Sequence, residues 1–365
     1  MTNKPTKANK GEWSEFYTLL KLLAEQKLYA ADEHLEKLKD IFYPVLKVIT
    51  AKNSDREISF ELDDGEDIKV FNPRTASITS VKRLVIKERI GRIFSAIKTA
   101  NVSTFEIPLA DEILEKLQKP VIKGYSHRKS DIVLVIHDVR TGIKPEVGFS
   151  IKSQVGGAST LLNPGTTTNF IFEINNFNST AEKINGIETR AKLRDRLKAI
   201  YDSGASLKFA GMESGIFEEN LIKMDSLLPD LIAEMVRIHY TGVASRITDI
   251  NNELEKSGYN LVPGHASQKG FYEFKIKHFL MNTALGMTPG RKWDGLLEVH
   301  GGYIIVREDG EIVCYHIYNQ DAFREYLYVN TRLETPSSSR YGYGSVYEQN
   351  GKHFIKLNLQ IRFTD

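Results

Sequence analysis

The segment SDIVLVIHDVRTGIKPEVGFSIKSQ, residues 130–154, constrains the fold of this chain more than any other stretch. Its apolar run IVLVI is typical of a central strand, and a turn containing Arg, Thr, Gly and Pro leads into a second strand. Side chains alternate along a strand, so we expect Phe149 and Ile151 on one face and Ser150 and Lys152 on the other. A lysine in this position is either a solvated surface residue or a catalytic one.

Length and composition exclude several classes of protein. A chain of 365 residues predicts about two domains. No run approaches the roughly 18 apolar residues of a membrane span, so we expect no membrane contact. Cys314 is the only cysteine, which rules out an intrachain disulfide. The N-terminus is polar and basic and lacks the apolar region of a secretory signal, so we expect a cytoplasmic protein.

Apolar periodicity predicts the other elements. We expect helices in residues 11–31, 77–100, 108–118 and 181–285, hairpins at 57–71 and 302–319, and strands at 325–334 and 353–363. The change from a helical middle to a β-rich end predicts three regions. These are a flexible basic arm at 1–10, a core with helical insertions at 11–286 and a β-rich part at 287–365.

The spacing within residues 130–154 also suggests a chemistry. Metal-dependent nucleases of the PD-(D/E)xK type place an acid at the start of one strand, and a carboxylate and a lysine two residues apart on the next strand. Asp131 stands at the start of the first strand, and Lys152 lies in the second. Ser150 occupies the position of the second acid. A hard cation prefers charged oxygen ligands, so another carboxylate is needed.

Three blocks of the sequence resemble the HpaII-type family of type II restriction endonucleases. They are KGEWSEFYTLLKLL, the segment from SDIVLVI to TNFIFEI, and the β-rich C-terminus. The resemblance implies an α/β fold with a restriction-endonuclease-like mixed β-sheet core flanked by helices. It implies Mg²⁺-dependent hydrolysis of double-stranded DNA at a short palindrome, CCGG for the namesake, with 5′-phosphate ends. A palindromic target favours a homodimer.

The resemblance assigns roles to individual residues. Asp131 becomes a metal ligand and Lys152 the catalytic lysine, and Ser150 fits the family's GFSIKS form. Gln154 continues the polar face, where it could orient water or touch the scissile phosphate. The second carboxylate is expected from Glu173, with Glu182 and Glu188 as alternatives, or from the first helix through Glu12 or Glu15, of which Glu15 matches the family's GEWSE block.

Polar loops supply candidates for DNA contact. Arginine can read guanine, and hydroxyl and amide groups bind phosphates and base edges, although the same residues also form ordinary surface turns. Arg340 is the base-reading candidate. The full set is Ser153, Thr160, Asn163, Thr167, Asn169, Arg291, Lys292, Ser339, Arg340 and Tyr341. Two other functions stay open, which are a non-catalytic DNA-binding protein with a nuclease-like fold and a nonspecific repair or junction nuclease.

Overall fold

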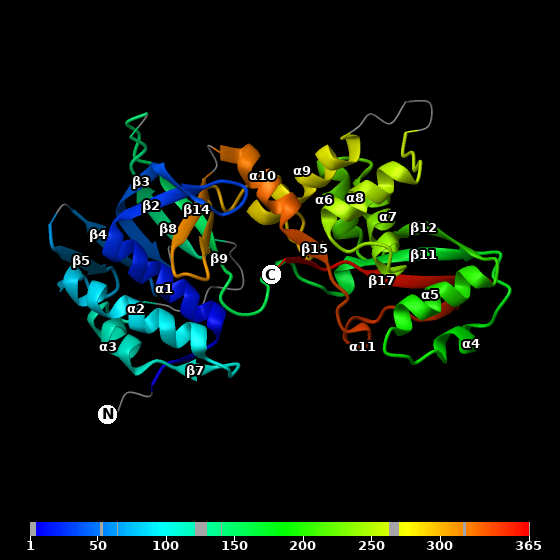
Figure 1. Ribbon diagram of the computed structural model, residues 1–365, viewed down its shortest axis with the longest axis horizontal. Coiled ribbons are helices and arrows are strands. Elements are labelled where there is room, and N and C mark those ends of the chain that lie inside the picture. The colour runs from blue at the N-terminus through cyan, green and yellow to red at the C-terminus, as the bar shows by residue number, and fades with distance from the viewer. Residues whose placement is uncertain are drawn as a thin grey trace. The chain divides into compact units, whose positions relative to one another are not determined.

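The computed structural model describes residues 5–51, 54–63, 65–120, 130–139, 141–262, 270–316 and 319–364. The chain forms two compact units, whose elements are labelled in Figure 1. The first unit consists chiefly of Met1–Ser159 and Leu297–Phe323, and the second of Thr160–Leu296 and Arg324–Thr364. Each unit therefore combines two separate stretches of the sequence.

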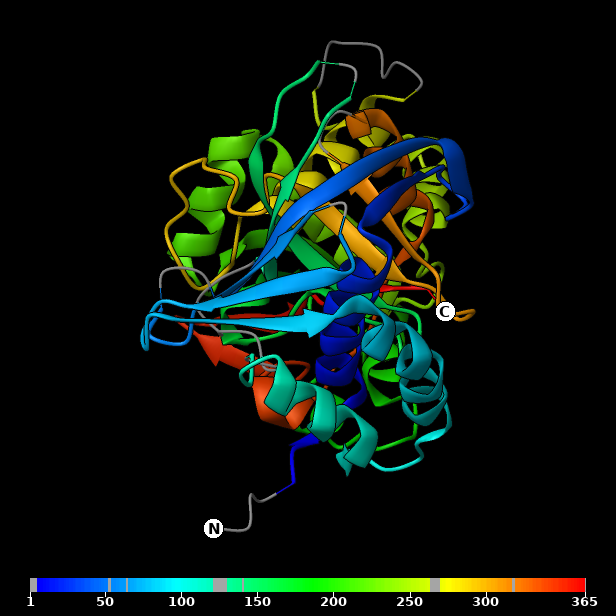
Figure 2. The ribbon, with the colours of Figure 1, turned by 90° about the vertical axis from the view of Figure 1, so that its left-hand side faces the viewer.

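A nine-stranded mixed sheet forms the centre of the first unit, with the order β2-β14-β13-β9-β8-β3-β4-β5-β6. β13 is parallel to β9 and β14 is parallel to β2, and β2 also pairs with the long strand β3, which crosses the view in Figure 2. The strands are β2 (Lys27–Ala31), β3 (Lys37–Thr50), β4 (Ile58–Leu62), β5 (Asp67–Asn72), β6 (Ser77–Lys82), β8 (Ile132–Ile136), β9 (Glu146–Ser153), β13 (Gly302–Val306) and β14 (Ile312–His316).

One face of this sheet is covered by helix α1 (Lys10–Glu25), which stacks with α2 (Arg83–Thr99) and α3 (Pro108–Lys116) (Figure 1). A capping box starts α1: Asn9 Oδ1 accepts from the Glu12 N–H, and the Glu12 carboxylate accepts from the Asn9 N–H. Trp13 and the other apolar residues of α1 pack in one cluster with Phe149 and Ile151 of β9. The opposite face of β9 therefore carries Ser150 and Lys152. A short pair, β1 (Lys7–Ala8) and β7 (Phe105–Glu106), completes the unit.

Two smaller sheets and most of the helices form the second unit. The sheet orders are β12-β11-β17-β16 and β10-β18-β15, and α6 and α7 pack against β12. The strands are β10 (Thr160–Leu162), β11 (Asn169–Asn175), β12 (Ser206–Met212), β15 (Thr331–Leu333), β16 (Val346–Gln349), β17 (Lys352–Asn358) and β18 (Ile361–Phe363). The helices are α4 (Ala181–Asn185), α5 (Lys192–Asp202), α6 (Gly215–Met224), α7 (Leu228–Tyr240), α8 (Ile247–Lys256), α9 (Phe271–Leu285), α11 (Ser338–Tyr341) and most of α10 (Gln320–Val329), with a 3₁₀ turn at Thr166–Thr168.

The predicted mixed α/β architecture is confirmed, and the expected hairpins form as the antiparallel pairs β4–β5, β8–β9 and β13–β14. Within the described residues, no helix is both long enough and apolar enough to cross a bilayer.

Four expected elements were wrong in part. Residues 27–31 form strand β2 and not the end of the first helix, because this stretch pairs with β3 and β14. Residues 77–82 form strand β6 and not the start of a helix, because this stretch, rich in β-branched residues, pairs with β5 along its length. Residues 206–212 form strand β12 inside the predicted helical region, since β11 provides a partner. Residues 325–329 end helix α10, where Phe323, Tyr326 and Leu327 are buried at helical spacing.

Candidate active site

Asp131, Ser150 and Tyr303 form a row across three neighbouring strands, which we call the polar row. Asp131 directly precedes β8, and its N–H donates to the Phe149 carbonyl at 2.8 Å, so it stands opposite Ser150 of β9. On the other side of Ser150, Tyr303 of β13 is its partner in the parallel ladder. The row lies on the face of the sheet opposite α1, because Ile132 and Phe149, next in sequence, pack on the α1 face.

Glycines allow β13 to lie close to β9 and β14. The Gly301 N–H donates to the Gly148 carbonyl at 2.8 Å, and a Cβ on Gly301 would stand 2.7 Å from that same oxygen. Gly302 has a φ of +104°, and a Cβ there would lie 1.8 Å from the Tyr315 carbonyl oxygen. Only glycine fits this backbone, so the pair directly before Tyr303 fixes its position in the row.

Asp131 is held by two hydrogen bonds to a single carboxylate oxygen. The Ile151 N–H donates to Oδ2 at 2.7 Å, and the Ser150 hydroxyl donates to the same atom at 3.0 Å. Burial raises the pKa of the Asp131 carboxyl above its ordinary value, although the nearby Lys152 charge and both hydrogen bonds act in the opposite direction. No described residue donates a hydrogen bond to Oδ1, so this oxygen remains for a further ligand.

Lys152 extends from the same face of β9 as Ser150. Its side chain is half-buried, and Nζ lies 5.6 Å from the centroid of the Tyr303 ring. Its charge also acts on the Asp131 carboxyl. The structure thus brings Asp131 and Lys152 together on one face of adjacent strands. The sequence prediction did not include Tyr303; its signal is a Gly-Gly pair directly before it at the start of a strand.

The residues after Lys152 take different directions. Ser153 lies on the α1 face, where the buried hydroxyl of Ser14 donates to Ser153 Oγ at 3.0 Å. Gln154 is exposed, and its N–H donates to the Val306 carbonyl at 2.9 Å. Ser153 therefore joins the sheet to α1, on the face away from Lys152.

The two acids predicted to assist Asp131 lie in different units. Glu15 is a half-buried residue of α1, next in sequence to Ser14. Glu173 belongs to β11 of the second unit, where its carboxylate forms an ion pair with Lys352 at 2.9 Å. Within the described ranges, no three His, Cys, Asp or Glu side chains gather into a metal cage. Mg²⁺ is often bound through one or two carboxylates together with substrate phosphates and water, and Asp131 Oδ1 fits that mode of binding.

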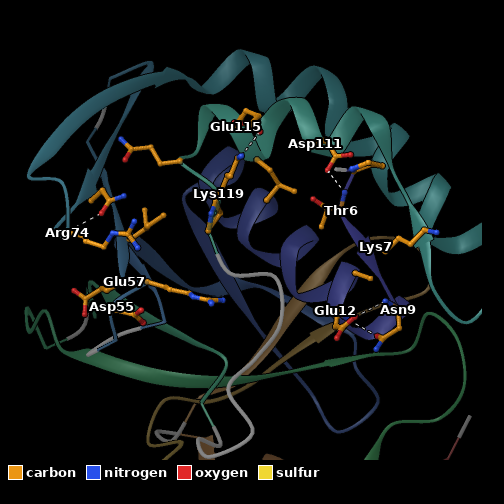
Figure 3. Close-up of a pocket in the computed structure, with 18 of the residues that line it drawn as sticks. Thr6, Lys7, Asn9, Glu12, Asp55, Glu57, Arg74, Asp111, Glu115 and Lys119 are labelled. Atoms are coloured by element: carbon orange, nitrogen blue, oxygen red, sulfur yellow. Dashed lines mark hydrogen bonds and ion pairs between the residues drawn. The ribbon is translucent and has the colours of Figure 1, made fainter. Parts of the chain in front are cut away.

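A cavity of about 940 Å³ opens elsewhere on the first unit (Figure 3). Both acids and bases line it, and the close-up labels Glu12, Asp111, Glu115 and Lys119 among them. Neither Asp131 nor Lys152 belongs to its lining. Glu12 is thus a helix cap at this cavity, which supports the structural role of a carboxylate near a helix N-terminus.

The other predicted DNA-contact residues belong to the second unit. Ser339 and Arg340 are exposed on α11, and the Arg340 guanidinium lies 5.3 Å from the centroid of the half-buried Tyr341 ring. Lys292 pairs with Glu219 at 2.8 Å. The remaining residues divide by exposure, with Asn163 and Arg291 exposed and Thr160 and Thr167 half-buried. Surface position is compatible with DNA contact for these residues.

Asn169 is fully buried and joins the two polar loops of the second unit. Its Nδ2 donates to Glu213 Oε2 at 2.7 Å and to the Tyr341 carbonyl at 2.9 Å. Its Oδ1 accepts from Asn358 Nδ2 at 2.7 Å, and Asn358 also donates to the Gly165 carbonyl at 2.7 Å. The side chain therefore holds the turn around Gly165 and the turn beside Arg340 in one arrangement, so we assign it a structural role.

We expect Asn169→Asp to lower the free energy of unfolding by about 1–3 kcal/mol, because a carboxylate would face both Glu213 and the Tyr341 carbonyl without a donor. Urea unfolding of the purified protein measures the loss. The exposed Asn163→Asp is the control, for which the expected change is within about 0.5 kcal/mol. Equal stability of the two variants would contradict this role for Asn169.

Comparison with known proteins shows the family of this chain. The family model described as HpaII restriction endonuclease matches residues 9–363. The chain is 40% identical over 359 residues to the type II restriction enzyme HpaII of Haemophilus parainfluenzae, covering 97% of this chain and 98% of that enzyme. No solved structure matches the chain. Both the match to the family model and the identity extend over nearly the whole length, and the chain therefore belongs to the HpaII restriction endonuclease family.

Proposed function

We propose that this type II restriction endonuclease hydrolyses phosphodiester bonds of double-stranded DNA at a short palindrome, with Mg²⁺ as cofactor and 5′-phosphate ends as products. CCGG is the first sequence to test, because the family resemblance suggests it. The observation that carries the proposal is the convergence of Asp131 and Lys152 on one face of the β8–β9 hairpin, where the Ser150 hydroxyl donates a hydrogen bond to Asp131.

Each residue of the site has a role that follows from its chemistry. The Lys152 ammonium places positive charge beside the scissile phosphate, where negative charge develops in the transition state. Asp131 presents Oδ1 as a metal ligand, while Ser150 and the Ile151 N–H fix its other oxygen. Bound Mg²⁺ would polarise the phosphate and lower the pKa of water. We propose that Gln154, which is exposed, contacts the DNA backbone.

Ser150 explains how the site works without an acid at this position. A second carboxylate next to buried Asp131 would add like-charge repulsion, whereas the hydroxyl donates a hydrogen bond to it. The missing ligand must then come from another element. We propose Glu15, because it matches the GEWSE block of the family resemblance. α1 packs on the other face of β9, and its first residue, Lys10, lies beside Gly156 just past the end of that strand, so the Glu15 carboxylate would reach the metal around the strand end.

Two matched substitutions test the choice of the second carboxylate. We expect Glu15→Gln to raise the Mg²⁺ concentration for half-maximal cleavage by about tenfold or more, in the range found for altered metal surroundings. Glu173→Gln should leave it unchanged, because Glu173 is already neutralised by Lys352. Titration of the initial cleavage rate with Mg²⁺ gives both values. If Glu173→Gln raised the required Mg²⁺ concentration and Glu15→Gln did not, Glu173 would be the second ligand.

The second unit is the proposed recognition unit. Its exposed candidates are Asn163, Arg291, Lys292, Ser339 and Arg340, and Arg340 is suited to read guanine. Thr160, Thr167 and Tyr341 are proposed to contact phosphates at the edges of the same surface. A palindrome is matched best by a two-fold homodimer, and we keep the cytoplasm as the proposed location because the substrate is DNA that has entered the cell.

Incubation with unmethylated plasmid DNA and Mg²⁺ tests the function. We expect discrete fragments whose ends share one short palindrome and carry 5′-phosphates. A smear would indicate a nonspecific nuclease instead, and intact DNA that is still retained by the protein would indicate a binding protein without catalysis. Sequencing of the fragment ends identifies the target bases and the position of the cut.

A further inference from the structure

We propose that Tyr303 is a positioning residue that holds the Lys152 ammonium over the reacting phosphate. The inference rests on the catalytic role proposed for Lys152 and extends it to a strand that contains no nuclease motif. Three observations support it, which are the register of β13 against β9, the contact between ammonium and ring, and the burial of the ring.

The register fixes where the ring stands. Tyr303 is paired with Ser150, and the following pairs of the parallel ladder include Ile305 with Lys152. Lys152 is thus two residues further along its strand than the partner of Tyr303, on the same face. To approach the ring, its side chain must turn back along β9 to the level of Ser150. The contact with Tyr303 therefore holds the ammonium beside Ser150, on its β13 side, and not outward along β9.

The ring offers a rigid surface for this contact. Tyr303 is only 2% exposed, and its ring packs against Phe323 with centroids 5.0 Å apart. Lys152 Nζ lies 5.6 Å from the Tyr303 centroid, within the range of cation–π attraction. Lysine has a flexible stem with large rotamer entropy, so a fixed partner narrows the positions available to its ammonium.

An aromatic face suits a lysine that must bind phosphate. A carboxylate held tightly against Nζ would take up its N–H donors and neutralise its charge. The ring attracts the charge through its quadrupole and leaves the N–H groups for substrate oxygens. Tyr303 and Asp131 thus stand on either side of Ser150, and the Lys152 ammonium contacts the Tyr303 ring while its charge acts on the Asp131 carboxyl.

Substitution of the ring tests the proposal. We expect Tyr303→Leu to lower kcat for cleavage by roughly 3- to 30-fold, the range that corresponds to a partly desolvated cation–π contact. KM for DNA should stay the same, because the ring does not touch the substrate. Tyr303→Phe keeps the aromatic face and should recover most of kcat. If Tyr303→Leu does not fold, Tyr303→Met fills a similar space without a ring and replaces it in the test.

A double-mutant cycle separates positioning from a structural role. In a Lys152→Ala background, Tyr303→Leu should cause no further loss of residual cleavage. Tyr315→Leu is the matched control, because Tyr315 is 1% exposed, pairs with Tyr303 and packs on the same Phe323 ring. The folded fraction of the Tyr315→Leu protein should keep the wild-type kcat.

Three results would overturn the inference: equal loss in Tyr303→Phe and Tyr303→Leu, additive loss on top of Lys152→Ala, or a similar loss in Tyr315→Leu. Cleavage by Lys152→Ala at the wild-type rate would refute the catalytic role proposed for Lys152, on which the inference rests. An inactive Lys152→Ala together with a fully active Tyr303→Leu would refute only the role of Tyr303.

Discussion

Lys152→Ala should cleave DNA roughly 10²- to 10³-fold more slowly than the wild type, because one preorganised charge beside the transition state contributes that much. Its affinity for DNA should change little, since a single phosphate contact is lost among many. Initial rates on a plasmid with the target site, together with gel-shift titration of a short duplex, measure the two quantities separately.

Lys144→Ala is the matched control for this substitution. Lys144 is exposed in the turn between β8 and β9, so the variant removes a lysine from the same hairpin without touching the polar row. It should cut at the wild-type rate. If Lys152→Ala still cut DNA at the rate of Lys144→Ala, the catalytic assignment of Lys152 would have to be abandoned.

Asp131→Asn should abolish cleavage and weaken Mg²⁺ binding. Loss of the ligand removes several kcal/mol of charge stabilisation, which corresponds to roughly a thousandfold or more in rate. Calorimetric titration with Mg²⁺ in the presence of uncleaved duplex measures the affinity. Asp138→Asn provides the control, because this buried carboxylate lies beyond the other end of β8, where it accepts from the Thr141 hydroxyl.

Asp131→Asn should also stabilise the metal-free protein at neutral pH. Burial raises the pKa of Asp131 in the folded state, so the unfolded chain ionises more readily and ionisation favours unfolding. This penalty is absent below the ordinary pKa of aspartate, grows as pH rises toward the folded value, and is complete above it. Asparagine does not ionise and can still accept the Ile151 hydrogen bond. Melting curves in EDTA should show a higher Tm for Asp131→Asn at pH 7 and no such gain in acid.

Local sequence patterns predicted the part of the site that depends on a single hairpin. The run IVLVI and the alternation in GFSIKS were sufficient to place Asp131 and Lys152 on one face, because strand period and a short turn determine the register. Tyr303 could not be found in this way. It reaches Ser150 from a strand 153 positions away in the sequence, as the ladder shows, and nothing local to GGYIIV indicates which strand will be its neighbour.

The elements that differed from prediction also depend on contacts between distant parts of the sequence. Residues 206–212 and 77–82 became strands because partners were available, and strand formation depends on cross-strand packing more than on intrinsic preference. Asn169 looked like a loop residue suited to base contact. Its burial depends on Glu213, Asn358 and Tyr341, which converge from distant parts of the second unit.

The order of synthesis determines when the proposed active site can be completed. β9 has β8 on one edge from early in translation, but its other edge stays open until the ribosome has produced β13 and released it from the exit tunnel. A nascent polypeptide, or a product of a nonsense codon ahead of residue 302, contains Asp131 and Lys152 without the wall formed by Tyr303. Such fragments lack the parallel partner strand of β9 and one wall of the proposed site, so we expect full activity only from molecules that extend past β13.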